Sequence, residues 1–251
     1  LIASQATIMP KKNNSITSFR FQPGTLISGK YVIDQLLGVG WEAEVYLVHV
    51  KRTGIERTAK FFFPQRNLKD RAVKFYARKL HKLRKCPIVI QYSTQDTIKF
   101  NNRTISFLVS EYVEGELLTT HLKKQRGKRL HHFQGLHLLY ALAKGIESIH
   151  AVGEYHGDLH SDNIIVQHVG LEYSLKIIDM FQWNDSKRSN IHSDVMDLIR
   201  IFYDALGGQK HYANQPQEVK NICCGLKHSI ALRKFNSAGK LRQYIENINW
   251  S

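Results

Sequence analysis

The stretch that decides the fold reads His156-Gly157-Asp158-Leu159-His160-Ser161-Asp162-Asn163-Ile164-Ile165-Val166. It places an asparagine five residues after an aspartate, and an apolar run with strand composition follows directly. Before it, residues 133–150 carry apolar side chains at helical spacing, which predicts a long helix. The pattern therefore predicts a polar loop that joins a long helix to a buried strand.

A second aspartate follows the next apolar run, in Ile177-Ile178-Asp179-Met180-Phe181. Residues 164–166 and 175–178 have the composition of a short strand pair, so Asp179 is predicted to end a buried strand. An aspartate at the end of a strand is common in proteins. Its position after the 156–166 motif makes Asp179 a candidate metal ligand.

Two further signals precede these motifs. The segment Gly38-Val39-Gly40-Trp41-Glu42-Ala43-Glu44-Val45 lies between two predicted strands, and its small residues would let backbone amides approach phosphate oxygens. Lys60 lies in an apolar strand, where burying an unpaired ammonium is costly and a nucleotide phosphate would be a suitable partner. Taken singly, each signal has a simpler interpretation: a plain hairpin turn, and a solvated lysine on the polar strand face.

The order of elements predicts an α+β chain. Strands are expected over 31–40, 44–50 and 56–63, a helix with one apolar and one basic face over 68–85, and two more strands near 88–92 and 105–110. Further helices are expected over 194–206 and 241–248. The predicted domains are a flexible basic tail (1–24), an N-lobe with a small antiparallel sheet (25–110), a hinge (111–115) and a helical C-lobe (116–251), with a cleft between the lobes.

Together, the four signals resemble the protein kinase superfamily, over residues 25–248. The loop 156–166 matches the kinase pattern H-x-D-x-x-x-x-N at its polar and its apolar positions. The opening at Lys30-Tyr31-Val32-Ile33 is similar to bacterial Ser/Thr protein kinases. Phe107–Gly115 looks like the hinge, with Ser110 as gatekeeper, and Ser193–Ile199 looks like the helix whose aspartate supports the catalytic loop.

This resemblance implies ATP and Mg²⁺ as cofactors, and it implies a role for each site residue. Asp158 would orient and deprotonate the acceptor hydroxyl, Lys60 would contact the α- and β-phosphates, and Asn163 and Asp179 would bind Mg²⁺. The remaining nucleotide-binding residues that it implies are Gly38, Val39, Gly40, Ala43, Val45, Ala59, Glu111 and Val113.

Three of the departures from the family concern residues at or near the predicted site. No glutamate occurs between residues 57 and 110, so the helix glutamate that normally pairs with the strand lysine is missing; Glu42, Glu44 and Asp179 are candidate replacements. Gly157 replaces the arginine that precedes the catalytic aspartate and receives an activation-loop phosphate. His160 stands where Ser/Thr protein kinases usually carry lysine, and His156–His160 resembles small-molecule phosphotransferases.

The predicted function is ATP- and Mg²⁺-dependent transfer of the γ-phosphate to a hydroxyl, with a Ser/Thr protein kinase as the leading interpretation. A kinase for RNA or a small molecule is one alternative. A pseudokinase that binds partners without catalysis is another, and the missing helix glutamate favours it.

Charge and cysteine content suggest partners and compartment. The net charge is +15, which should attract an acidic macromolecule such as RNA or an acidic protein. Basic residues gather at 71–85 and at 123–129; ordinary solvated surface is the alternative interpretation of both clusters. Three cysteines do not form a disulfide framework, and no apolar run approaches the roughly 20 residues of a membrane helix, so a cytoplasmic protein is expected.

Overall fold

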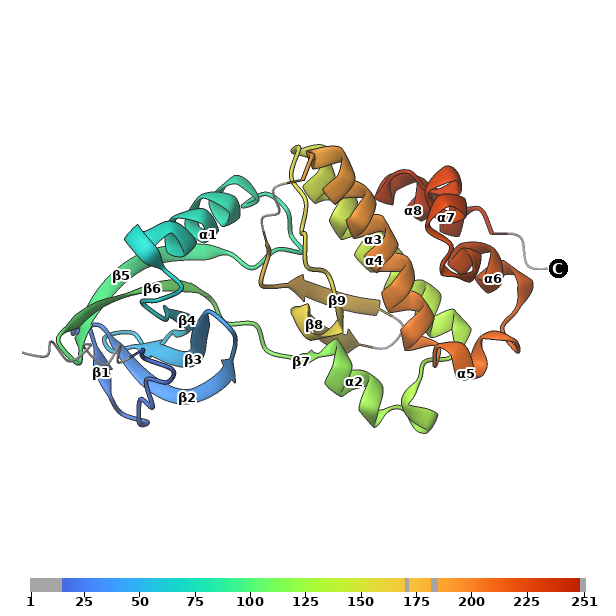
Figure 1. Ribbon diagram of the computed structural model, residues 1–251. Helices are drawn as coiled ribbons and strands as arrows, with labels where there is room; N and C mark the ends of the chain where they lie inside the picture. Colours follow the sequence, from blue (N-terminus) through green and yellow to red (C-terminus); the bar gives the residue numbers. More distant parts are fainter. Residues whose placement is uncertain (1–14, 170–171, 182–184, 249–251) are drawn as a thin grey trace, which may run out of the picture. The chain divides into compact units, whose positions relative to one another are not determined.

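The computed structural model describes residues 15–169, 172–181 and 185–248 (Figure 1). This part of the chain forms two compact units. The first unit holds the described residues up to Ala77 together with Ser93–Ser110, and the second holds Arg78–Tyr92 and the described residues from Glu111 onward. The division passes through helix α1 (Arg71–Lys82), so residues 78–92 belong to the second unit, whereas the predicted N-lobe ran from 25 to 110.

The first unit is built on a six-stranded sheet in the order β1-β2-β3-β4-β6-β5. The strands β2, β3 and β4 pair antiparallel in sequence order, which short turns permit. The three strands predicted over 31–63 are therefore confirmed. The bounds are β1 (Leu26–Ile27), β2 (Tyr31–Val39), β3 (Ala43–Val50), β4 (Glu56–Phe62), β5 (Tyr92–Phe100) and β6 (Arg103–Glu111).

Two consecutive phenylalanines on β4 show that both faces of this sheet are covered. Successive side chains of a strand point to opposite faces. Phe61 stacks on Phe107 with ring centroids 4.8 Å apart, and Phe62 lies 5.7 Å from the ring of Tyr76 on α1. Both phenylalanines are buried. Helix α1 therefore covers one face, and an aromatic cluster fills the other.

The segment before β1 corrects one prediction. Residues 1–24 were expected to form a flexible tail, of which 1–14 lie outside the described residues. From Ser15 onward the chain packs on the sheet: Ile16 and Phe19 are buried, and Phe21 lies 5.0 Å from the ring of Phe61. Apolar area removed from water stabilises this docking.

A second correction concerns residues 88–92, which were predicted to form a strand. Ile88 and Val89 are buried, but only an isolated parallel bridge joins Val89 to Ile177. The next strand is instead β5 (Tyr92–Phe100), an edge strand of the sheet. Its sequence is mostly polar because an edge strand is largely solvated, so apolar composition gave no indication of it.

The second unit combines a three-stranded sheet with helices. The strands β8 and β9 pair antiparallel, as predicted for 164–166 and 175–178, and β7 lies beside β8. The strand bounds are β7 (Glu116–Leu117), β8 (Ile164–Val169) and β9 (Glu172–Ile177). The helix bounds are α2 (Leu118–Lys124), α3 (His132–Ala151), α4 (Lys187–Ala205), α5 (Gln209–Tyr212), α6 (Gln217–Cys223), α7 (His228–Lys234) and α8 (Ala238–Glu246).

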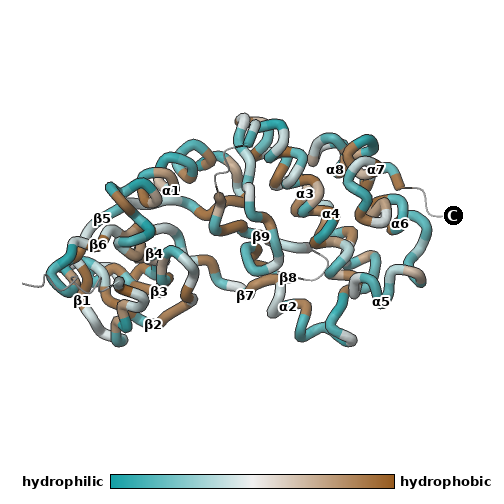
Figure 2. Tube along the Cα trace, in the orientation of Figure 1, coloured by the Kyte–Doolittle hydropathy of each residue, from teal (hydrophilic) through white to brown (hydrophobic). Residues whose placement is uncertain are grey.

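Helix α3 is the centre of the second unit, and it packs against α4, α8 and β9. Its buried residues include Leu138, Leu142 and Ile146. Figure 2 shows hydrophilic and hydrophobic residues alternating along α1, the pattern of a helix with one exposed face. Helices α4 and α8 begin earlier than predicted, because the hydroxyls of Ser186 and Ser237 accept backbone N–H groups and cap their first turns.

Candidate active site

The glycine loop is an open hairpin tip between β2 and β3. The amide of Gly40 donates to the carbonyl of Ala43 over 2.8 Å, which closes the turn. Nothing lies within 4 Å of the position a Gly38 Cβ would take, and Val39 and Trp41 are exposed. The backbone here is therefore accessible to a ligand, as a phosphate-binding loop requires.

The strand lysine lies directly across from this loop. Val45 of β3 pairs with Lys60 of β4, and the neighbouring pair joins Tyr46 to Ala59. The Lys60 ammonium lies 2.9 Å from Glu42 Oε1, and only 13% of the Lys60 side chain is exposed. The charge is therefore partly buried but paired, and the ion pair offsets the cost of burying an ammonium in an apolar strand.

The predicted hinge begins where β6 ends, at Glu111. Its carboxylate accepts from the Gln91 amide over 3.0 Å and from Lys176 Nζ over 2.6 Å. Val113 follows in an irregular segment and is partly buried. The Glu111 side chain is thus held by residues of the second unit. A ligand would therefore be contacted by the backbone of this segment rather than by the Glu111 side chain.

The catalytic loop brings Asp158 and Asn163 together. Asn163 Nδ2 donates to the Asp158 carbonyl over 2.8 Å and lies 3.4 Å from Asp158 Oδ2. The Asp158 side chain is 50% exposed, so the carboxylate can reach a solvent-side acceptor. His160 Nε2 lies 2.9 Å from Asn163 Nδ2 and 3.7 Å from Asp158 Oδ2. A carboxylate with a fixed backbone and an open side chain suits a general base.

A buried aspartate of α4 holds this loop from behind. Asp194 accepts from the amides of His156 over 2.7 Å and Gly157 over 2.9 Å, and from His150 Nε2 over 3.0 Å. Asp194 is fully buried, so these bonds compensate the desolvation of its charge. This geometry confirms the expectation that the aspartate of residues 193–199 supports the catalytic loop.

His156 transmits this support to Asp158. Burial lowers the pKa of His156, so its imidazole is neutral. Nε2 lies 2.9 Å from the Ile178 carbonyl, and the Asp158 amide donates to Nδ1 over 3.2 Å. A neutral ring with its proton on Nε2 satisfies both contacts, and it ties the backbone of Asp158 to the segment that ends at Asp179.

The glycine that replaces the family arginine has a steric reason. Gly157 has φ +86°, and a Cβ there would lie 2.8 Å from the backbone carbonyl of Phe181. Phe181 also donates its amide to the His156 carbonyl over 3.0 Å. A side chain at position 157 would push this segment away from the catalytic loop.

The two predicted metal ligands lie on adjoining backbone segments, since the Ile178 amide donates to the Asn163 carbonyl over 3.0 Å. Asp179 itself has φ +55°, an uncommon conformation for a residue with a side chain. In the part of the chain that the structure describes, every hydrogen bond of the Asn163 side chain uses its nitrogen. The amide oxygen therefore remains for a cation, and a hard oxygen donor fits Mg²⁺.

Two residues that matter at the site were missed from the sequence. Tyr76 was assigned only to the apolar face of its helix, yet its hydroxyl donates to Glu42 Oε1 over 2.7 Å. Lys79 is buried, donates to the Phe181 carbonyl over 3.1 Å and lies 4.4 Å from the ring centroid of Tyr155. Lys79 follows Tyr76 by three residues, so helical spacing alone placed it on the buried face.

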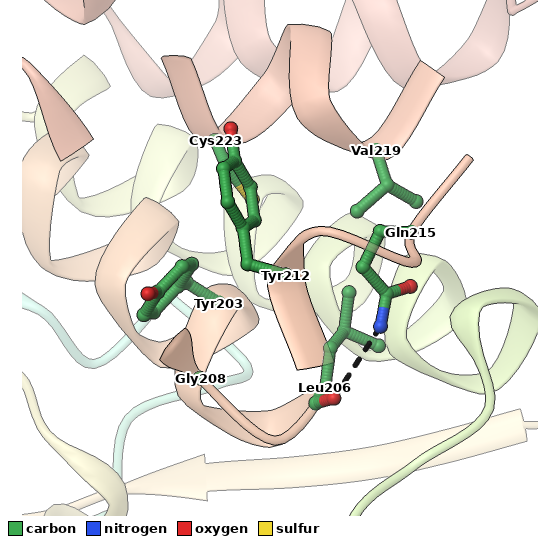
Figure 3. A pocket seen from close by; sticks show the side chains of 7 residues that line it. All are labelled: Tyr203, Leu206, Gly208, Tyr212, Gln215, Val219 and Cys223. Carbon is green, nitrogen blue, oxygen red and sulfur yellow. Dashed lines mark hydrogen bonds between the residues drawn. The ribbon is translucent and has the colours of Figure 1, made fainter. Parts of the chain in front are cut away.

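A small pocket of the second unit lies elsewhere (Figure 3). The rings of Tyr203 and Tyr212 lie 5.3 Å apart beside it, and Gln215 Nε2 donates to the Leu206 carbonyl over 3.4 Å. None of the predicted site residues lines this pocket. It is a packing feature beside α4 and α6, separate from the site described above.

Comparison with known proteins identifies the family. The profile of the protein kinase domain matches residues 31–213. The chain is a member of the protein kinase domain family. This identity confirms the recognition made from the four motifs and the predicted enzyme class. The kinase domain is 28% identical to CBL-interacting serine/threonine-protein kinase 12 of Arabidopsis thaliana over 173 residues. That alignment covers 67% of this chain and 33% of the relative, so the kinase domain spans about a third of that protein.

Solved structures agree on the fold. The PknI kinase domain of Mycobacterium tuberculosis matches with a TM-score of 0.63 at 15% identity, covering 90% of this chain and 98% of that chain. A double mutant of the same domain matches with a TM-score of 0.62 at 16% identity, covering 90% and 96%. The predicted fold class, an antiparallel-sheet lobe followed by a mainly helical lobe, is confirmed.

Neither a metal cluster nor a membrane span occurs within residues 15–169, 172–181 and 185–248. No group of three or more histidine, cysteine, aspartate or glutamate side chains in these ranges is placed to hold a metal ion. A magnesium site made from one amide, one carboxylate and nucleotide phosphates would not form such a group. No helix among these residues has the length and apolar character needed to cross a membrane.

Proposed function

We propose that this kinase domain transfers the γ-phosphate of ATP to a serine or threonine hydroxyl of a protein, with Mg²⁺ as cofactor. The observation that carries the proposal is the exposed Asp158 carboxylate, whose backbone is held by Asn163 on one side and by Asp194 through His156 and Gly157 on the other. The name of the Arabidopsis relative, a serine/threonine-protein kinase, supports serine and threonine as acceptors.

Asp158 accepts the proton of the acceptor hydroxyl as the phosphate is transferred, and it orients that hydroxyl. Lys60 contacts the α- and β-phosphates with an ammonium already fixed by Glu42. Amides of the glycine loop cover the phosphates. The residues proposed to line the nucleotide are Gly38, Val39, Gly40, Ala43, Val45, Ala59, Glu111 and Val113.

Asn163 and Asp179 would hold the magnesium ion, with oxygen ligands on adjoining backbone segments. When bound, the cation supplies neutralisation of the charge that develops on the phosphate oxygens. The chain's own contribution is to fix these ligands: the Asn163 nitrogen is tied to Asp158, which leaves the amide oxygen for the cation.

One observation favours a second acceptor class. His160 lies 3.7 Å from Asp158 at a position where Ser/Thr protein kinases usually carry lysine, and the loop resembles small-molecule phosphotransferases. An RNA or small-molecule hydroxyl is therefore the alternative acceptor. The basic segment 123–129 would favour an acidic macromolecule as partner.

A cytoplasmic location is proposed from the low cysteine content.

The test measures transfer from γ-labelled ATP to generic protein, bulk RNA and aminoglycosides, each with wild type and with Asp158→Asn. The variant keeps the shape of the side chain but loses the proton acceptor, so turnover should fall by about 100-fold or more while ATP affinity changes little. Asp162→Asn is the matched control, because Asp162 is an exposed carboxylate of the same loop.

Label on protein alone supports the leading proposal, and label on RNA or aminoglycoside alone replaces it with the alternative. ATP binding measured by thermal shift, without transfer to any acceptor, would identify a pseudokinase. Equal turnover of Asp158→Asn and wild type would remove Asp158 from the mechanism.

A further inference from the structure

The kinase domain lacks the helix carboxylate that its family uses, yet Lys60 is paired. Helix α1 carries no acidic residue. The partner is Glu42, which comes from the glycine loop: its Oε1 lies 2.9 Å from Lys60 Nζ, and 19% of its side chain is exposed. Glu44, two residues further, is engaged elsewhere, since it accepts from the Phe19 amide and the Tyr46 hydroxyl. The strand lysine thus has a carboxylate partner in the loop.

Helix α1 contributes a tyrosine to the same cluster. The Tyr76 hydroxyl donates to Glu42 Oε1 over 2.7 Å, and Lys60 Nζ lies 4.2 Å from the centroid of the Tyr76 ring. The helix therefore supplies a hydrogen bond to the carboxylate and an aromatic face to the ammonium. Because one Glu42 oxygen accepts from both residues, their positions are coupled.

The loop around Glu42 is anchored to the end of β4. The Phe63 amide donates to the Glu42 carbonyl over 2.8 Å, and the Arg66 guanidinium lies 4.2 Å from the ring centroid of Trp41. The backbone on each side of the Glu42 carboxylate is therefore held. These contacts place the carboxylate before a nucleotide binds, and all of them lie within the first unit.

We propose that Glu42 is the positioning residue for Lys60 and replaces the missing helix glutamate. An ammonium has three N–H donors, and Glu42 occupies one while the ring of Tyr76 shields another side. The long Lys60 side chain is thereby ordered before a nucleotide binds, so the entropy of ordering it is not lost on binding. The position of Lys60 then depends on the glycine loop, which covers the phosphates in the proposed function on which this inference rests.

The test compares Glu42→Gln with wild type in ATP affinity, turnover and melting temperature. Glu42→Gln keeps the shape and removes the charge, so kcat/KM for ATP should fall by on the order of 10-fold or more, the effect of losing a charge-assisted hydrogen bond. Tyr76→Phe keeps the ring and should give a smaller loss in the same direction. Glu56→Gln is the matched control, because Glu56 is an exposed glutamate of the same strand as Lys60.

A second arm moves the carboxylate to the helix. In the Glu42→Gln background, Tyr76→Glu places a carboxylate beside Lys60 from α1 and should recover part of the missing kcat/KM, whereas a general loss of folding would not be recovered. Unchanged kcat/KM in Glu42→Gln overturns the proposal. Higher activity in Glu42→Gln also overturns it, because Glu42 would then compete with the phosphates.

A measurement without turnover separates this inference from the proposed function. The ¹⁵N-labelled ammonium of Lys60 should give a slowly exchanging NMR signal in the wild type, and Glu42→Gln should lose it while the melting temperature stays close to that of the control. If the wild type transfers no phosphate, the proposed function fails, and this signal still decides the role of Glu42. An identical Lys60 signal in both proteins refutes the positioning role.

Discussion

At the scale of single residues, Asp158 and Asp194 have a third acidic residue close enough for their charges to act on it. Asp197 of α4 is largely buried, and burial, followed by the charges of Asp194 and Asp158, raises its pKa to about 7. The Asp194 carboxylate accepts hydrogen bonds from the amides of His156 and Gly157, which stabilise its charge. Within the described residues, the Asp197 side chain makes no hydrogen bond. Its ionisation therefore opposes folding.

The difference between the pKa of Asp197 in the folded and in the unfolded state predicts how stability changes with pH. The folded pKa of Asp197 lies above the ordinary value of 3.8, so the folded state holds a proton that the unfolded state has released, and stability falls as pH rises from about 4 to about 7. Asp197→Asn should raise the free energy of unfolding at pH 8 by up to about 4 kcal/mol and leave it unchanged at pH 4. Urea unfolding at both pH values measures this, with the exposed Asp185→Asn as control. Equal gains at the two values would contradict the assignment.

At the scale of elements, helix α1 carries its positive charge on two different faces. Arg71, Lys74 and Arg78 are exposed, as the predicted basic face requires. Lys79 is buried instead, and desolvation lowers its pKa to about 8, against the opposing attraction of Glu154 and Asp194. Its bond to the Phe181 carbonyl ties this helix to the segment that follows Asp179.

The burial of Lys79 should make the free energy of unfolding depend on pH in alkaline solution. The folded pKa of Lys79 lies below the ordinary 10.5, so between about pH 8 and 10.5 the unfolded state holds the extra proton and stability rises with pH. Lys79→Met lacks this titration. The free energy of unfolding of the wild type should therefore gain about 3 kcal/mol relative to Lys79→Met across that range. Denaturant titrations at pH 7.5, 9 and 10.5 test this, with Lys85→Met as the exposed control; parallel curves for Lys79→Met and wild type would disprove the burial of a charge.

At the scale of the whole molecule, the net charge of +15 exceeds what one nucleotide needs. In the segment 123–129, Lys123, Arg126 and Lys128 are exposed, while Lys124 pairs with Glu116 over 2.6 Å. Uncompensated charges in one compact segment repel each other, so a polyanion would be bound favourably there.

Replacing Lys123, Arg126 and Lys128 by glutamine should weaken binding of single-stranded RNA. The slope of log K against log salt should fall by roughly 0.7 for each phosphate that the variant no longer neutralises. The control removes three exposed charges of the first unit, in Lys51→Gln, Arg52→Gln and Arg103→Gln, and should change the slope less. Fluorescence anisotropy from 50 to 200 mM salt measures both. Equal slopes for the two triple variants would leave the 123–129 segment as ordinary solvated surface.

The sequence by itself determined the family and located the loop that is proposed to be catalytic. Asp158 and Asn163 are five residues apart on one loop, and local spacing is enough to recognise them. The strands of the first unit and the long helix α3 were equally readable, because their apolar residues repeat with the period of the element. The docked segment 15–24 and the edge strand β5 were not, since their order comes from long-range packing and pairing rather than from local composition.

Only the tertiary structure decided that Glu42 pairs with Lys60 and why residue 157 is glycine. Glu42 and Tyr76 lie 18 positions before and 16 positions after Lys60 in the chain, and no local period links them. The fold of the first unit brings the loop carboxylate and the ring of Tyr76 to one ammonium, and the Tyr76 hydroxyl to that carboxylate. Gly157 is likewise required by the Phe181 carbonyl, 24 residues away, which would lie 2.8 Å from any Cβ. Such contacts depend on how distant segments pack, and a single sequence specifies that packing only through the whole fold.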